Sequence, residues 1–167
     1  AYLDAKQGEW IFNPVQGEWR GYRGAPDGTV EQWIPVGNAG EKLYAWWSPA
    51  AQPDAPVLLY LHGARWNLTG SVTRIPRWNT MGFSVLAIDY RGFGKSREDS
   101  GDDLPSEERA YEDALAAWAW IAREHPNLRR YVFGHSLGGA IAVNLAAEAS
   151  DASGLIVEGS FPSIAAV

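Results

Sequence analysis

Four short, unbroken apolar runs dominate the chain from residue 57 onward. A strand that helices cover on both faces is apolar at successive positions, whereas a strand with one solvated face alternates. The runs therefore predict buried strands, and they are VLLYLHG (57–63), FSVLAIDY (83–90), YVFGHS (131–136) and GLIVEGS (154–160).

The clearest helical period lies between residues 106 and 124. Apolar side chains recur there at steps of three and four residues, at Tyr111, Ala114, Leu115, Trp118 and Ile121. Ser106 stands at the N-cap position, acidic residues fill the first turn, and Pro126 lies just beyond the end. Further helices are expected over about 71–81 and after Ser136. Strands that alternate with helices predict a parallel sheet in an α/β fold, with an all-β barrel as the alternative.

The earlier part of the chain has a different pattern. VEQWIPV (30–36) and EKLYAWWSP (41–49) predict two strands, and the stretch from Gly37 to Gly40 predicts the hairpin turn between them. Residues 1–30 are rich in Gly, Trp and Pro and predict an irregular N-terminal leader.

Composition narrows the class of protein. A length of 167 residues suits one domain, and a net charge of −6 without a basic block makes nucleic acid an unexpected partner. The absence of cysteine excludes disulfides, thiolate zinc sites and a cysteine nucleophile. We expect no metal, no cofactor and no membrane span, because neither ligand spacing, a P-loop nor a long apolar run is present. The start at Ala1 leaves open a cytoplasmic protein or one exported after loss of an N-terminal segment.

The candidate chemistry centres on Ser136. Gly134-His135-Ser136-Leu137-Gly138 matches G-x-S-x-G, and it lies between a predicted strand and a predicted helix. Small residues on both sides of a serine let the backbone make a strained turn that exposes the hydroxyl. Ser136 is therefore the candidate nucleophile, and the alternative is a serine that merely caps the helix.

Backbone amides are the candidate oxyanion donors. A helix that starts at Leu137 points its free amides at a developing oxyanion, and a strand that ends in His62-Gly63 presents the next amide to the same cleft. We expect the amides of Ala64 and Leu137 to serve, with Arg65 as the alternative to Ala64.

Two residues at strand ends have two interpretations each. His62 is either the base for Ser136 or, more in keeping with its place before the oxyanion loop, a structural histidine. Asp89 is either a triad acid or a buried carboxylate that satisfies loop amides and Arg91.

Taken together, these segments resemble the α/β-hydrolase superfamily, and more narrowly its bacterial serine-esterase and lipase-like members. The resemblance covers about residues 31–163 and rests on YLHGARWNLTGS, VLAIDYRGFGKS, YEDALAAWAWI, GHSLGGAIAVNLA and GLIVEGSF. It implies a doubly wound, mostly parallel sheet with the nucleophile after strand five, the acid usually after strand seven and the histidine after strand eight.

By this count GLIVEGS is strand six, so the sheet is expected to be truncated there, and residues 31–167 form the N-terminal two thirds of one α/β-hydrolase domain. The triad acid and histidine are then missing, and the chain by itself is expected to be inactive. His125 precedes the serine strand, at the opposite edge of the sheet, and His135 is expected to point away from Ser136. Glu158 is a candidate acid, or else a carboxylate that binds the following turn.

For the complete protein the resemblance implies hydrolysis of a small apolar ester or acyl substrate through an acyl-enzyme on Ser136. Thioesterase, amidase and acyltransferase activities stay open, as does a non-catalytic binding module on the same fold. Trp66 and Trp78 are expected near the acyl pocket. An oligomer or a second chain is expected to complete the sheet at strand six.

Overall fold

The computed structural model describes residues 25–63, 71–91 and 107–159. Within these ranges the secondary structure follows the order β1 (Val30–Val36), β2 (Glu41–Ser48), β3 (Val57–Leu61), α2 (Ile75–Thr80), β4 (Ser84–Ile88), α3 (Glu107–Glu124), β5 (Arg130–His135), α4 (Leu137–Glu148) and β6 (Gly154–Glu158). The strands coincide with those predicted from apolar runs and from the hairpin pattern, whereas most of the predicted leader lies outside the described residues.

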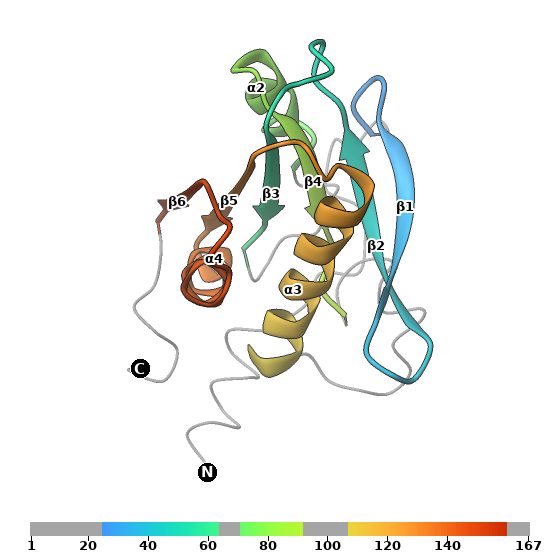
Figure 1. Cartoon of the computed structure of the whole chain (residues 1–167), viewed down its shortest axis with the longest axis vertical. Coiled ribbons are helices and arrows are strands. Elements are labelled where there is room, and N and C mark those ends of the chain that lie inside the picture. The colour runs from blue at the N-terminus through green and yellow to red at the C-terminus, as the bar shows by residue number, and fades with distance from the viewer. Residues whose placement is uncertain (1–24, 64–70, 92–106, 160–167) are drawn as a thin grey trace.

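The six strands form one mixed sheet in the order β1-β2-β4-β3-β5-β6 (Figure 1). The hairpin strand β2 pairs antiparallel with both β1 and β4. The pairings of β4 with β3, of β3 with β5 and of β5 with β6 are all parallel. The carboxyl ends of these four strands therefore meet at one edge of the sheet. The fold class expected from the sequence, an α/β-hydrolase type of sheet, is therefore observed.

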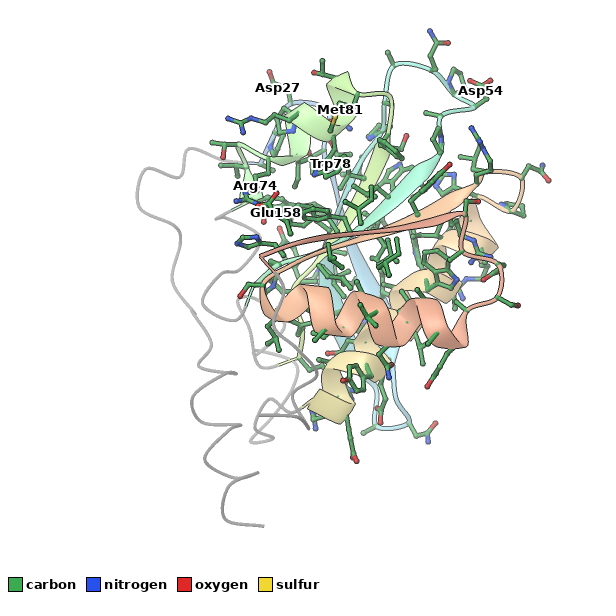
Figure 2. The ribbon with its side chains drawn as sticks, turned by 90° about the vertical axis from the view of Figure 1, so that its left-hand side faces the viewer. Asp27, Asp54, Arg74, Trp78, Met81 and Glu158 are labelled. Atoms are coloured by element: carbon green, nitrogen blue, oxygen red, sulfur yellow. The ribbon has the colours of Figure 1, made fainter. Side chains whose placement is uncertain are left out.

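Helices cover both faces of this sheet. Helices α3 and α4 contribute Ala114, Ile121 and Ile141 to one apolar cluster, and α2 contributes Ile75 to a second cluster on the other face. Figure 2 shows α2 and α4 on opposite sides of the strands. Burial on both faces explains why β3 and β4 are apolar at successive positions, since every residue of both strands is buried.

One helix is shorter than its sequence pattern predicted. Residues 71–81 were expected to be helical, but α2 spans only Ile75–Thr80, and Pro76 lies in its first turn. Residues 71–74 form turns instead. Because Pro76 has no amide hydrogen to donate to residue 72 and is tolerated only in the first turn of a helix, α2 starts no earlier. Helix α3 follows its predicted range, although Ser106 lies outside the described residues.

Strand β6 departs from the expectation that its apolar run is buried. Leu155 and Val157 are 41% and 44% exposed, and Val143 on α4 is 48% exposed. Within the part of the chain that the structure describes, β6 pairs only with β5. An apolar run predicts that other elements pack over the strand, but the described residues leave Leu155 and Val157 largely uncovered.

Candidate active site

Ser136 occupies a strained turn between β5 and α4. Its backbone angles are φ 57° and ψ −120°, and it is the only non-glycine residue with positive φ among those described. Such angles are costly for a residue with a Cβ atom and persist only where the surrounding structure imposes them. Ser136 directly follows the last residue of β5, so it lies at the carboxyl edge of the sheet, where it is half-buried.

Two glycines make this turn possible by close packing. A Cβ atom on Gly134 would lie 2.0 Å from the carbonyl oxygen of Gly138. A Cβ atom on Gly138 would lie 2.1 Å from the carbonyl oxygen of Leu61, at the end of β3. Both glycines of the G-x-S-x-G pattern are thus needed so that backbone segments can come into close contact, as the sequence predicted.

The hydrogen bonds of Ser136 involve its backbone. Its amide donates to the carbonyl oxygen of Glu158 at 2.9 Å, and its carbonyl oxygen accepts from the amide of Gly139 at 2.9 Å. The residue stands at the N-cap of α4, but its hydroxyl makes no capping hydrogen bond. The alternative interpretation of Ser136 as a side-chain cap is therefore wrong.

Leu137 is the first residue of α4, and its side chain is fully buried. First-turn amides of a helix have no acceptor within the helix, and the helix dipole favours negative charge there. Gly63 approaches from β3, since a Cβ atom on it would lie 3.3 Å from that of Ser136. The chain after β3 therefore starts beside the serine, while Ala64 and Arg65 themselves lie outside the described residues.

His62 is held in place by its surroundings. It is fully buried, its Nδ1 lies 2.7 Å from the carbonyl oxygen of Gly63, and its Nε2 lies 3.3 Å from Oδ1 of Asp89. The hydroxyl of Tyr90 donates to the His62 carbonyl oxygen at 3.1 Å. These contacts support the interpretation of His62 as a structural residue of the β3 end rather than a base.

One interpretation of the sequence paired Arg91 with Asp89, but in the structure Arg91 pairs with other carboxylates. Its Nε donates to Oδ1 of Asp113 at 2.6 Å, and its backbone amide donates to Oδ2 at 2.8 Å. The same guanidinium contacts Glu112 at 2.9 Å and Glu41 at 3.5 Å. The turn after β4 is thus anchored to α3 and β2.

Burial raises the pKa of Asp113 to about 6, although Arg91 and Arg109 oppose the rise. Sequence reasoning missed Asp113, but a signal for it exists. It stands three residues after Ala110 and four before Ala117, on the buried face of α3. A carboxylate on that face needs a cationic partner.

Among the described residues, the Glu158 carboxylate contacts Arg74 and His135, while the segment after Gly159 lies outside the described residues. Its Oε1 lies 3.0 Å from Nη1 of Arg74 and 3.3 Å from Nδ1 of His135. Burial lowers the pKa of His135, Arg74 lowers it further, and Glu158 opposes both. Arg74 was not expected at the site, since it is distant from Glu158 in the chain and reaches it only because α2 covers that face of the sheet.

His125 lies at the edge of the sheet opposite to the edge that carries Ser136, as predicted. It follows α3 and precedes β5, and its ring stacks on Trp47 with a centroid distance of 4.3 Å. Ser136 follows the carboxyl end of β5. His125 therefore cannot reach the serine hydroxyl in this arrangement.

Trp78 belongs to the core more than to a pocket. It is partly buried, and its ring lies 5.0 Å from that of Phe133 and 5.7 Å from that of Phe83. Trp66, the other residue expected to border an acyl pocket, lies outside the described residues. Within the described ranges no cluster of potential metal ligands occurs, and no helix has the length and hydropathy to cross a membrane.

Comparisons with known proteins agree with this geometry. The family model described as serine aminopeptidase, S33, matches residues 51–166. The lysophosphatidylserine lipase ABHD12 of Danio rerio is 33% identical over 141 residues, which cover 78% of this chain and 35% of that protein. Human protein ABHD12B is 32% identical over 111 residues, which cover 65% of this chain and 29% of that protein. The chain thus spans about a third of the length of these curated relatives.

Solved structures are similar as well. A thermostable carboxyl esterase from Bacillus coagulans superimposes with a TM-score of 0.68 and 27% identity, over 81% of this chain and 44% of that one. An esterase from Pyrococcus furiosus superimposes with a TM-score of 0.69 and 21% identity, over 90% of this chain and 56% of that one. The second similarity concerns the fold alone.

A strained serine turn at the carboxyl edge of a parallel sheet, with helices on both faces, defines an α/β hydrolase. Within that superfamily, the chain belongs to the serine aminopeptidase S33 family.

Proposed function

We propose that this chain carries the nucleophile and part of the oxyanion hole of a serine hydrolase that cleaves lipid-like carboxylic esters. The observation that carries the proposal is the backbone of Ser136, with φ 57° and ψ −120°, in a turn where its hydroxyl caps no helix. Strain of this kind at a purely structural serine would cost stability without return. It is accounted for if the turn presents the hydroxyl to a substrate.

In this mechanism the Oγ of Ser136 attacks the ester carbonyl carbon, and its proton passes to a base. The amide of Leu137, supported by the dipole of α4, holds the negative charge that develops on the carbonyl oxygen. The amide of Ala64 is the proposed second donor. The carbon–oxygen bond of the ester then breaks, the alcohol leaves with a proton, and water hydrolyses the acyl-enzyme.

We propose that the base comes from outside these 167 residues. All three histidines are described, and each is engaged elsewhere, His62 by Gly63 and Asp89, His125 by Trp47, and His135 by Glu158. Glu158 is better explained by its contacts with Arg74 and His135 than as a triad acid. We therefore expect the 167 residues alone to react slowly, with residual help from the oxyanion hole.

We propose an ester rather than a peptide as the substrate because of what the relatives are named for. The curated relatives that are more than 30% identical include proteins named as lysophosphatidylserine lipases, and a similar structure is a carboxyl esterase. The family description as an aminopeptidase indicates the same nucleophile chemistry on an amide.

The test is intact mass spectrometry after treatment with a fluorophosphonate, which phosphonylates an activated serine. A form of the protein that includes its base should gain one adduct, and Ser136→Ala should abolish it. Ser153→Ala replaces an exposed serine at the start of β6 and should leave labelling unchanged. The 167-residue chain alone, with a mass of 18.3 kDa, should label far more slowly.

Rapid labelling of the 167 residues would show that one of the three histidines acts as the base. No adduct on any form that folds would support the non-catalytic binding module instead.

A further inference from the structure

An ion pair lies beside the serine turn and has no part in the mechanism above. The side chains of Arg74 and Glu158 meet at 3.0 Å, and they are 27% and 56% exposed. Figure 2 shows the two labelled side chains next to each other, with Trp78 on the same side of the sheet. The pair therefore faces solvent at the edge where the strands end.

Glu158 connects this pair directly to Ser136. Its carbonyl oxygen accepts the hydrogen bond of the Ser136 amide at 2.9 Å, while its carboxylate contacts Arg74. Arg74 is thus separated from the candidate nucleophile by a single residue. A group that replaced the Glu158 carboxylate on Arg74 would lie in the immediate neighbourhood of the serine.

The surroundings favour exchange of the carboxylate for another anion. Ion pairs with this much exposure are weak, because water screens both charges, so little holds Glu158 in place. The planar guanidinium can donate two parallel hydrogen bonds to a pair of oxygens of a phosphate or a carboxylate. Trp78 is a partly buried member of the apolar cluster on the same side of the sheet as Arg74, so a ligand bound at Arg74 would have an apolar side chain to contact as well (Figure 2).

An anionic ligand needs a specific cationic side chain to bind here, because the net charge of the chain is negative. The chain carries −6, so an anionic amphiphile gains nothing from its overall field. Burial together with Arg74 disfavours the protonated form of His135, whose pKa is lowered. Arg74 is then the permanently charged group that reaches the carboxylate next to the serine.

Resting on the function proposed above, we propose that Arg74 recognises an anionic group, a phosphate or a carboxylate, on the ester substrate. Glu158 occupies Arg74 when substrate is absent and is displaced when it binds. The site therefore selects anionic amphiphilic esters over neutral ones.

Binding of single-chain ligands tests this without hydrolysis. Isothermal titration at low salt compares octyl phosphate, nonanoate and the neutral octyl glucoside, each below its micelle concentration. The protein should bind the better of the two anions about tenfold more tightly than octyl glucoside, and the two anions identify the preferred headgroup. Arg74→Gln should remove this preference, while Glu158→Gln should strengthen anion binding about threefold because the internal competitor is gone.

The matched control is Arg77→Gln, which removes an exposed arginine of the same helix and should leave all three affinities unchanged. The proposal is overturned if Arg74→Gln spares the anion preference, if Glu158→Gln weakens it in a protein with unchanged circular dichroism, or if Arg77→Gln has an equal effect.

Outcomes for the two proposals are separable. Fluorophosphonate labelling at Ser136 without any anion preference would leave the ester hydrolase standing and reduce Arg74 to a structural role. Anion preference without labelling would retain the binding site and remove the catalytic function.

Discussion

The carbonyl oxygen of Leu61 lies 2.1 Å from the point where a Cβ atom on Gly138 would stand. The first turn of α4 is thus seated directly on the end of β3. Because α4 begins immediately after Ser136, this contact determines where the serine is held relative to the neighbouring strand.

Gly138→Ala should therefore destabilise the fold. The new methyl group meets backbone atoms that cannot rotate away, and we expect the free energy of unfolding to fall by about 3 kcal/mol. Urea denaturation followed by circular dichroism measures this. Gly40→Ala is the control, because Gly40 has φ +78° and open space around its Cβ position, so only the cost of the backbone angle applies, about 1 kcal/mol. Equal losses in both variants would contradict the packing argument.

Strain at Ser136 predicts a trade between stability and reactivity. Glycine adopts a positive φ without steric cost, but it also gains freedom in the unfolded chain. We expect Ser136→Gly to be about 1 kcal/mol more stable than Ser136→Ala, while both lose the fluorophosphonate adduct. A glycine variant that is less stable than the alanine variant would show that the turn is not strained.

Asp113 predicts a particular dependence of stability on pH. Its pKa is raised from 3.8 to about 6 in the folded protein, so the folded state binds this proton more tightly than the unfolded chain does. The stability that this carboxyl contributes is full below about pH 4 and is lost as the pH rises to about 6. The slope is about 1.4 kcal/mol per pH unit.

Urea denaturation at pH 4–7 measures that slope. Asp113→Asn should remove it, even though the variant loses an ion pair. Glu112→Gln alters the exposed partner of Arg91 and should retain it. Parallel pH profiles for the wild type and Asp113→Asn would contradict the assigned shift.

Asp151 joins three segments at the amino end of β5. It accepts a hydrogen bond from the Trp118 indole at 3.1 Å and pairs with Arg130. Asp151→Ala should lower the free energy of unfolding by about 1 kcal/mol, since the carboxylate is half exposed. Glu124→Ala breaks only a 3.9 Å contact with Arg123 and should have no measurable effect. A shift of tryptophan emission in the first variant alone would locate the change at Trp118.

Local pattern was sufficient for the strands and for most of the helices. Strands β3 and β4 were recognisable because continuous burial demands continuous apolarity. The serine turn was recognisable because its glycines are needed for close backbone contacts, Gly134 with Gly138 and Gly138 with Leu61. Helix α2 was overestimated because Pro76 limits it at the start. The apolar run of β6 predicted a buried strand, but Leu155 and Val157 are exposed, because burial depends on neighbours that the run itself does not identify.

The partners of charged groups were predicted less well. Arg91 lies two residues after Asp89, which one interpretation of the sequence made its partner, yet it pairs with Asp113 on α3. Arg74 and Glu158 are 84 positions apart and meet only in the folded chain. Spacing along the chain says little about ion pairs, because a guanidinium takes whichever carboxylate the packing of helices and strands brings within reach.

By itself the sequence determined the alternation of strands and helices, the strained serine turn and the residue that stands in it. These follow from side-chain burial and backbone sterics over a few residues. Only the tertiary structure decided that His62 lies beside Asp89, that Glu158 faces Arg74 and His135, and that His125 stacks on Trp47. Those relationships depend on which strand lies beside which and on where α2 crosses the sheet, and both are settled by long-range packing.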